Sequence, residues 1–442
     1  MGTVDTLALI GFAVICAAGA SVLALIPALH VFNVAGLVIL VAGSLSSIMS
    51  LDQLAMLMVG MVVGYSMLNT ISATFLAAPD ESTAFLVLPG QKWLLQRRGY
   101  EAVILSGVGG LAGLAIVVAA SPVVGEAARI LYSIVTPHLG WILAAISAFI
   151  LMSEWPRAGE RGRTRLGRFL AAWTQLGAGI LTFFLSGLLG MLIMYRSVVP
   201  IEFAFQNLLP AFVGLFAVPA VLTNFVMGAR VPEQHITRSL DVTPSHLARG
   251  VASGALGGWF AAFFPVVTGG VGAFLAAHAT AQRDDRVFIL SQGVSKAIYY
   301  VGGFLLFFIP GLNLARGGMA AMLGAIYTPA TSLIYYTTVA AIAVSGAASF
   351  LLLLILARAA VRVVQHVPYR ITNAATLAIL VSLVAFLTGP GGLLILLTAT
   401  GIGLIPILFG SRRMNCLGVL LVPITLNILG LGPTIASWLG LL

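Results

Sequence analysis

A short polar segment between long apolar stretches holds the side chains of greatest chemical use in this sequence. Two adjacent acids, Asp80 and Glu81, follow Pro79 and precede the hydroxyl residues Ser82 and Thr83. Carboxylates can bind a cation or carry a proton, whereas hydroxyls and the free N–H groups of a helix start can bind an anion. Because an acid pair would repel an anion, we assign ion coupling to Asp80 or Glu81.

A plainer interpretation of this segment is a solvated helix start at a membrane surface, where proline and acids are common. A functional site is favoured because the preceding apolar run contains polar residues between positions 69 and 74. A charge pair beside a helix break is also costly inside a membrane unless it is paired or used. We therefore expect Asn69, Pro79, Ser82 and Thr83 to bind substrate in a broken or re-entrant helix.

The composition indicates a protein that crosses a membrane many times. Only 8% of the 442 residues are charged and 60% are apolar, whereas soluble proteins carry about 25% charged residues. At about 20 residues per span, the chain has room for roughly 10 to 12 transmembrane helices. We expect one all-α polytopic membrane domain over residues 1–442. No motif for a cofactor, a metal ion or nucleic acid is visible, so we assign none.

Apolar runs and basic loops define the expected spans and their orientation. The spans are expected near residues 7–28, 34–50, 54–77, 102–121, 139–153, 169–194, 211–228, 288–309, 332–356, 373–388, 393–409 and 414–430. Arginine is concentrated in loops 154–168, 229–249, 357–370 and 411–413. Basic loops stay in the cytoplasm, so we place these four loops there, in a multi-pass protein of the cell membrane.

A weak internal repeat relates two parts of the chain. The tripeptide Ala84-Phe85-Leu86 recurs as Ala273-Phe274-Leu275, a shift of 189 residues from position 84 to position 273. Two further short matches occur in the same order with similar shifts. We expect two related halves, residues 30–153 and 211–356, arranged as inverted repeats, because many transporters are built in this way.

The second half has its own interrupted segment at the place that matches the acid pair. It contains Pro265 and the run Thr268-Gly269-Gly270. Glycine there allows either close approach of the backbone to a ligand or tight packing of helices, and the sequence leaves both open. We expect Pro265, Thr268, Gly269 and Gly270 to complete a substrate site with the first segment, near the middle of the membrane.

The run APDESTAFLVLPG at 78–90, followed by QRRGYEAVILSGVGGLAG at 96–113, resembles the large membrane subunit of tripartite tricarboxylate transporters, the TctA family, and especially its shorter archaeal-type members. Looser matches occur at 254–272, 314–320 and 404–423. In one respect the chain differs, because Pro265 is followed by valines where the family carries a Pro-Gly-x-Gly core.

The resemblance implies a secondary transporter of a small organic anion, such as a di- or tricarboxylate. We expect coupling to Na⁺ or H⁺ and alternating access at a site in the membrane. Members of the family work with a small membrane subunit and an extracytoplasmic binding protein. The sequence also leaves open that the chain forms a homo-oligomer. A translocase of polyprenyl phosphate or another lipid-linked phosphate is the alternative, since it would use similar helix ends and a basic face. An intramembrane enzyme is disfavoured because no nucleophile–base or metal motif is visible.

The orientation of the basic loops can be tested by cysteine labelling. In a background without Cys16 and Cys416, we expect Arg168→Cys, Arg238→Cys and Arg362→Cys to resist a membrane-impermeant maleimide in intact cells. All three should react after the cells are permeabilised. Ready labelling of two of them in intact cells would reverse the orientation.

Overall fold

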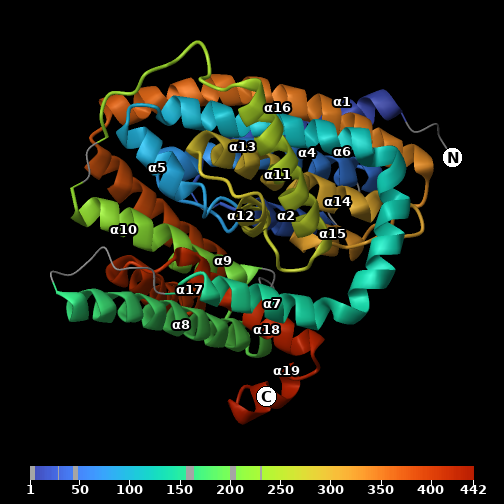
Figure 1. Ribbon diagram of the computed structural model, residues 1–442. Helices are drawn as coiled ribbons and strands as arrows, with labels where there is room; N and C mark the ends of the chain where they lie inside the picture. Colours follow the sequence, from blue (N-terminus) through green and yellow to red (C-terminus); the bar gives the residue numbers. More distant parts are fainter. Residues whose placement is uncertain (1–4, 28, 43–47, 156–163, 200–205, 229–230) are drawn as a thin grey trace. The chain divides into compact units, whose positions relative to one another are not determined.

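Helices account for all the regular secondary structure that the computed structural model describes. The described residues are 5–27, 29–42, 48–155, 164–199, 206–228 and 231–442. Residues 156–163 and 229–230, which belong to two of the basic loops, lie outside these ranges. The expected all-α architecture is confirmed for the described chain (Figure 1).

The chain divides into two compact units. The first consists of residues 1–132 and 227–376, and the second of residues 133–226 and 377–442. The predicted halves, 30–153 and 211–356, each contribute to both units, so the units do not coincide with the halves. The relation between the halves therefore stays a prediction.

The first unit contains the acid pair and most of the helices. Its elements are α1 (Thr6–Leu23), α2 (Val31–Leu40), α4 (Leu51–Phe75), α5 (Val87–Leu95), the larger part of α6 (Gly99–Val135), α11 (Pro244–Phe263), α12 (Gly269–Ala279), α13 (Asp285–Ala297), η4 (Ile298–Gly302), α14 (Gly303–Leu305), η5 (Leu306–Phe308), α15 (Gly317–Gly324) and α16 (Ser332–His366). Helices α1, α4 and α16 pack on one another, and α11, α12 and α13 form a second packed group (Figure 1).

The second unit is built mainly from long helices. Its elements are η1 (Thr136–His138), α7 (Leu139–Met152), α8 (Arg165–Tyr195), α9 (Leu208–Phe212), η3 (Val213–Ala217), α10 (Val218–Val226), the larger part of α17 (Tyr369–Phe409), η6 (Arg413–Leu417), α18 (Gly418–Ile428) and α19 (Gly432–Trp438). Helix α18 packs against α7 and α8. Helix α17 contains a non-helical residue, Gly389, at φ 65°, which separates the two spans expected at 373–388 and 393–409.

Seven helices of the described chain are long and apolar enough to cross a membrane, and a bent pair at 413–438 raises the number to eight. The sequence-based spans are more numerous for a physical reason. One continuous helical stretch covers two expected spans at 99–152, and another covers two at 369–409. The span expected at 288–309 is instead divided among α13, η4, α14 and η5. The multi-pass membrane architecture is confirmed.

Both interrupted segments are real breaks between helices. Helix α4 ends at Phe75 and α5 begins at Val87, whereas only residues 264–268 separate α11 from α12. Each break contains a non-glycine residue with positive φ, Ala77 at 52° and Val266 at 70°. Such a backbone conformation costs of order 1–3 kcal/mol, so the surrounding structure must hold it. The two residues are separated by the same 189-residue shift as the repeated tripeptide, which supports the predicted repeat.

Helix α4 is buried on almost every side, because small residues let its neighbours approach closely. A methyl group on Gly60 would collide with the backbone carbonyl oxygen of Ala13, and one on Gly64 with that of Ala17. Both partners belong to α1. The two glycines therefore set the distance between α1 and α4.

We expect Gly60→Ala to lower the free energy of unfolding by about 1–3 kcal/mol, since α1 must move away from α4. The matched control is Gly11→Ala on α1, where a methyl group would meet no atom within 4 Å. Alanine favours a helix over glycine, so the control should be neutral or stabilising. Thermal melting of the purified variants in detergent measures both effects, and equal melting temperatures would contradict the packing interpretation.

Candidate functional site

The Asp80 carboxylate is the centre of a dense set of hydrogen bonds in the α4–α5 break. Its Oδ1 accepts from the backbone N–H groups of Ser82 and Thr83, at 3.0 and 2.7 Å, and from their hydroxyls, at 2.8 and 2.7 Å. Its Oδ2 accepts from the Tyr65 hydroxyl at 2.7 Å and from Asn69 Nδ2 at 2.8 Å. The carboxylate thus organises the turn that begins the second half of the broken helix, in the manner of a helix N-cap.

A buried lysine provides the opposite charge. Lys296, on α13, is only 3% exposed, and its Nζ donates to Asn69 Oδ1 at 2.6 Å. The amide of Asn69 therefore lies between Lys296 and the carboxylate of Asp80 and hydrogen-bonds to both. A buried charge is tolerated when it is paired and hydrogen-bonded, and here the Asn69 amide links the two opposite charges through hydrogen bonds.

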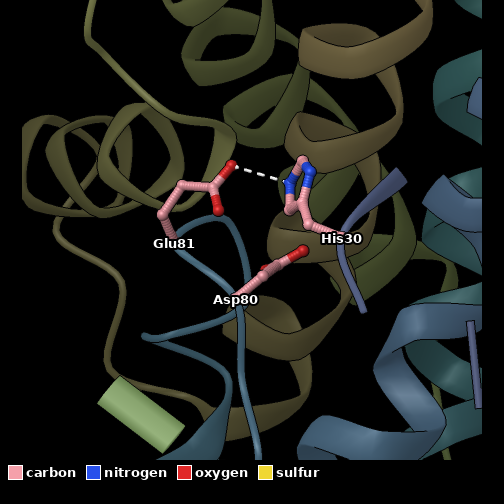
Figure 2. Close-up of side chains that lie close together, drawn as sticks. All are labelled: His30, Asp80 and Glu81. Atoms are coloured by element: carbon pink, nitrogen blue, oxygen red, sulfur yellow. Dashed lines mark hydrogen bonds and ion pairs between the residues drawn. The ribbon is translucent and has the colours of Figure 1, made fainter. Parts of the chain in front are cut away.

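The neighbouring acid lies in a different set of contacts (Figure 2). Glu81 Oε1 is 3.1 Å from His30 Nε2 and 3.1 Å from the Tyr300 hydroxyl. The same hydroxyl is 2.9 Å from His30 Nε2 and 3.1 Å from Asp80 Oδ2. One hydroxyl hydrogen can be donated to only one carboxylate at a time. Tyr300 therefore couples the hydrogen bonding of the two acids.

The tautomer of His30 follows from its second ring nitrogen. His30 Nδ1 accepts a hydrogen bond from the backbone N–H of Phe32 at 3.1 Å and so caps the start of α2. The hydrogen of the neutral ring must then be on Nε2, which faces Glu81 and Tyr300. A second proton on the ring would displace the cap, because Nδ1 would become a donor.

These contacts give the two acids separate roles. Asp80 is surrounded by hydrogen-bond donors. A proton on its carboxylate would point a hydrogen at a neighbour that already donates one, and a hydrogen bond would be lost. In the described chain, Glu81 Oε2 has no hydrogen-bond partner, and Oε1 shares its partners with other groups. Glu81 is therefore the acid that can exchange a proton with the least loss of hydrogen bonds.

The structure brings the second predicted segment against the first. Thr268 caps α12 and donates its hydroxyl hydrogen to the backbone carbonyl of Glu81 at 3.1 Å. A methyl group on Gly270 would lie 2.5 Å from the carbonyl oxygen of Ser82. Phe274, at the position that matches Phe85, stacks on Phe85 with the ring centroids 5.1 Å apart.

The two glycines of the second segment are close-packed against protein rather than open. A methyl group on Gly269 would lie 2.9 Å from the Cα of Lys296, and the Gly269 carbonyl accepts from the Ser295 hydroxyl at 2.7 Å. Tight packing therefore accounts for Gly269 and Gly270. Pro265 lines a small cavity whose wall also includes Tyr300.

Four residues of this cluster were not predicted: His30, Tyr65 and Tyr300, which bond to the acids, and Lys296, which bonds to Asn69. Lys296 had a usable signal, because it is one of only two lysines and lies inside an expected span. The other three carry no such signal, since a single histidine or tyrosine in an apolar run is usually a packed core residue.

The absence of a metal site was also expected, but three potential ligand atoms meet here. One atom each from His30, Asp80 and Glu81 lies within 4.8 Å of the others. The oxygens of Asp80 are already occupied by donors, so the arrangement suits proton exchange better than metal coordination.

An ionised, hydrogen-bonded network where two broken helices meet is typical of secondary transporters. The fold and the site thus define a membrane transport protein. The chain belongs to the tripartite tricarboxylate transporter TctA family, whose model matches residues 10–418. An uncharacterized protein of Methanocaldococcus jannaschii is 25% identical over 418 residues, covering 92% of this chain and 95% of the relative. No solved structure matches.

We expect Asp80→Asn to lower the free energy of unfolding by about 3–5 kcal/mol, because it leaves Lys296 as an uncompensated buried charge. The double variant Asp80→Asn/Lys296→Met should be more stable than Asp80→Asn alone. The matched control is Asp285→Asn, which removes an exposed carboxylate 2.5 Å from Lys92 and should cost about 0–1 kcal/mol. Melting in detergent measures all three. Strictly additive effects of the Asp80 and Lys296 changes would contradict the pairing.

Proposed function

We propose that this chain is a permease that carries a small organic anion, such as a di- or tricarboxylate, by alternating access, and that a proton on Glu81 drives it. One observation carries the proposal: Glu81 is buried at the junction of the two broken helices. Its side chain contacts His30 and Tyr300, and its backbone carbonyl accepts from Thr268 of the second segment. A change in its protonation would act directly on that junction.

A proton fits this site better than Na⁺ does. Hard cations need several oxygen ligands with free lone pairs. Both oxygens of Asp80 accept hydrogen bonds, and the Asn69 carbonyl oxygen accepts from Lys296. Among the acids of this cluster, only Glu81 retains an oxygen without a donor. Proton transfer needs one such oxygen, whereas a sodium site needs several.

Protonation of Glu81 would rearrange its neighbours in a defined way. The ionised Glu81 accepts from His30 and Tyr300, so these two side chains face it as donors. A protonated Glu81 becomes a donor itself, and the Tyr300 hydroxyl hydrogen is then free to point at Asp80. The titratable groups around this change are His30 before α2, Tyr65 on α4, Asp80 in the break, Lys296 on α13, and Tyr299 and Tyr300 on η4.

An ion pair and a hydrogen bond elsewhere in the first unit connect the two predicted halves and would form a gate between them. Lys92 of the first half lies 2.5 Å from Asp285 of the second. The backbone N–H of Asp241 donates to the Glu101 carboxylate at 3.4 Å. The Lys92–Asp285 pair is exposed, so water can replace it when the segments separate. In a conformation without the Lys92–Asp285 and Asp241–Glu101 contacts, the two predicted halves would be free to separate here.

The family also suggests the partners of this chain. The TctA protein is the large subunit of a tripartite transporter, so we propose a small membrane subunit and an extracytoplasmic binding protein as its partners. The binding protein would deliver the anion to the open permease. Substrate choice would then be shared between the binding protein and the cavity in the membrane.

We expect Glu81→Gln to lose uptake driven by a pH gradient while it retains exchange of anion across the membrane. Proteoliposomes loaded with succinate or citrate measure exchange, and an imposed pH gradient measures driven uptake. Loss of the exchangeable proton should lower driven uptake by about tenfold or more. The matched control is Glu126→Gln, which changes an exposed glutamate on α6 that pairs with Arg129 of the same helix.

The result that overturns proton coupling is wild-type pH-driven uptake in Glu81→Gln. Uptake driven by a sodium gradient alone would assign the coupling to Na⁺ instead.

A further inference from the structure

A cavity next to the acid cluster is lined by an arginine, Arg316, whose side chain has no hydrogen bond and no carboxylate partner among the described residues. We propose that Arg316 is the binding group for a carboxylate of the transported anion in this cavity, an inference that rests on the proposed function. The cavity has a volume of about 60 Å³, room for one carboxylate group or a few waters. The lining residues used here are Phe32, Phe264, Tyr299, Tyr300, Arg316 and Gly317.

The guanidinium of Arg316 is unsatisfied in the described chain. Its Nε is buried and has no hydrogen-bond partner, and no carboxylate pairs with it. The guanidinium forms a cation–π contact with the ring of Tyr132, whose centroid lies 5.5 Å from the guanidinium carbon. Arginine carries five donors in a planar fork that matches a carboxylate. A partly buried arginine that is left without an anion in a membrane protein is a functional-site candidate.

The backbone next to Arg316 adds to the preference for an anion. Arg316 is the N-cap of α15, which begins at Gly317, and no side chain caps this helix start. Gly317 lines the same cavity and has a φ of 80°. The first N–H groups of α15 are therefore free to bind an anion, and the helix dipole favours negative charge there.

The walls of the cavity connect it to the proton site. Phe32 is the residue whose N–H donates to His30, and its ring centroid is 4.4 Å from that of His30. Tyr300 forms another part of the wall, and its hydroxyl reaches Glu81. A carboxylate bound at Arg316 would thus lie against Phe32, which packs on His30, and against Tyr300, which contacts Glu81 directly. Binding of the anion and protonation of Glu81 are then coupled through direct neighbours.

The aromatic walls also define the class of ligand. Phe32, Phe264 and Tyr299 offer apolar ring surface, which suits the methylene groups of a short aliphatic acid. Inorganic phosphate has no methylene groups that could contact these rings. We therefore expect the cavity to favour carboxylates with a short carbon chain over phosphate of similar charge.

The first test needs no variant. Phenylglyoxal modifies accessible arginines, and peptide mapping by mass spectrometry gives the extent of modification at Arg316 in the wild-type chain. We expect succinate or citrate to lower the modification of Arg316 at least severalfold, with little effect at Arg362 on α16 and little protection by phosphate. Equal modification with and without carboxylates overturns the subsite, whatever the transport activity. Equal protection by phosphate overturns the assignment to carboxylates.

The second test uses exchange in proteoliposomes. We expect Arg316→Gln to raise the KM for succinate or citrate by about 10- to 100-fold. This is the loss of affinity that corresponds to one charge-assisted hydrogen bond. Arg316→Lys should lie between Arg316→Gln and the wild type, because it keeps the charge and loses the fork. Arg362→Gln is the matched control.

The two proposals can fail separately. An unchanged KM in Arg316→Gln overturns the subsite and leaves the permease function intact. A wild-type chain that exchanges neither acid overturns the permease function, while the modification experiment still decides the subsite.

Discussion

The buried charge of Asp80 is the constraint on which the first unit depends. A carboxylate taken out of water must be surrounded by donors, and here they come from separate parts of the chain. Tyr65 and Asn69 belong to α4, Ser82 and Thr83 to the break itself. Because the N–H groups of the break need an acceptor and the carboxylate needs donors, each satisfies the other. The interrupted helix is therefore a hydrogen-bonded element that holds α4, α5 and α13 in one arrangement.

Adjacent position in the chain did not give Asp80 and Glu81 the same environment. Asp80 accepts from the backbone and side chains of its own turn and of α4, whereas Glu81 faces His30 and Tyr300, and the hydroxyl hydrogen of Tyr300 can be redirected. One acid can thus fix the local geometry while the other changes its protonation. The coupling hypothesis from the sequence did not choose between them, and the geometry favours Glu81. Two neighbouring acids thus serve two needs of a transport protein: Asp80 stabilises the helix break, and Glu81 provides a group whose protonation can change.

The sequence allowed much of the fold and part of the site to be predicted, because those features are local. Composition and apolar runs indicate a polytopic α-protein, and the proline-containing segments indicate the two breaks. The partners of the acids were not predictable, since His30 and Tyr300 reach Glu81 from 51 and 219 positions away. Gly269 also shows the limit: glycine permits close approach, but only the structure shows that protein backbone fills the space. The cluster depends on tertiary contacts that no short pattern encodes.

The stacking of Phe85 on Phe274 has a consequence for how such a protein can move. If the predicted halves are related by a two-fold axis, equivalent residues touch each other only beside that axis. Inverted halves place the axis in the plane of the membrane, so this ring pair would mark its depth. When the two halves exchange conformations, each half takes up the contacts that the other had. A contact between equivalent residues on the axis is the same before and after this exchange. The two phenylalanines would then be a pivot that both access states share.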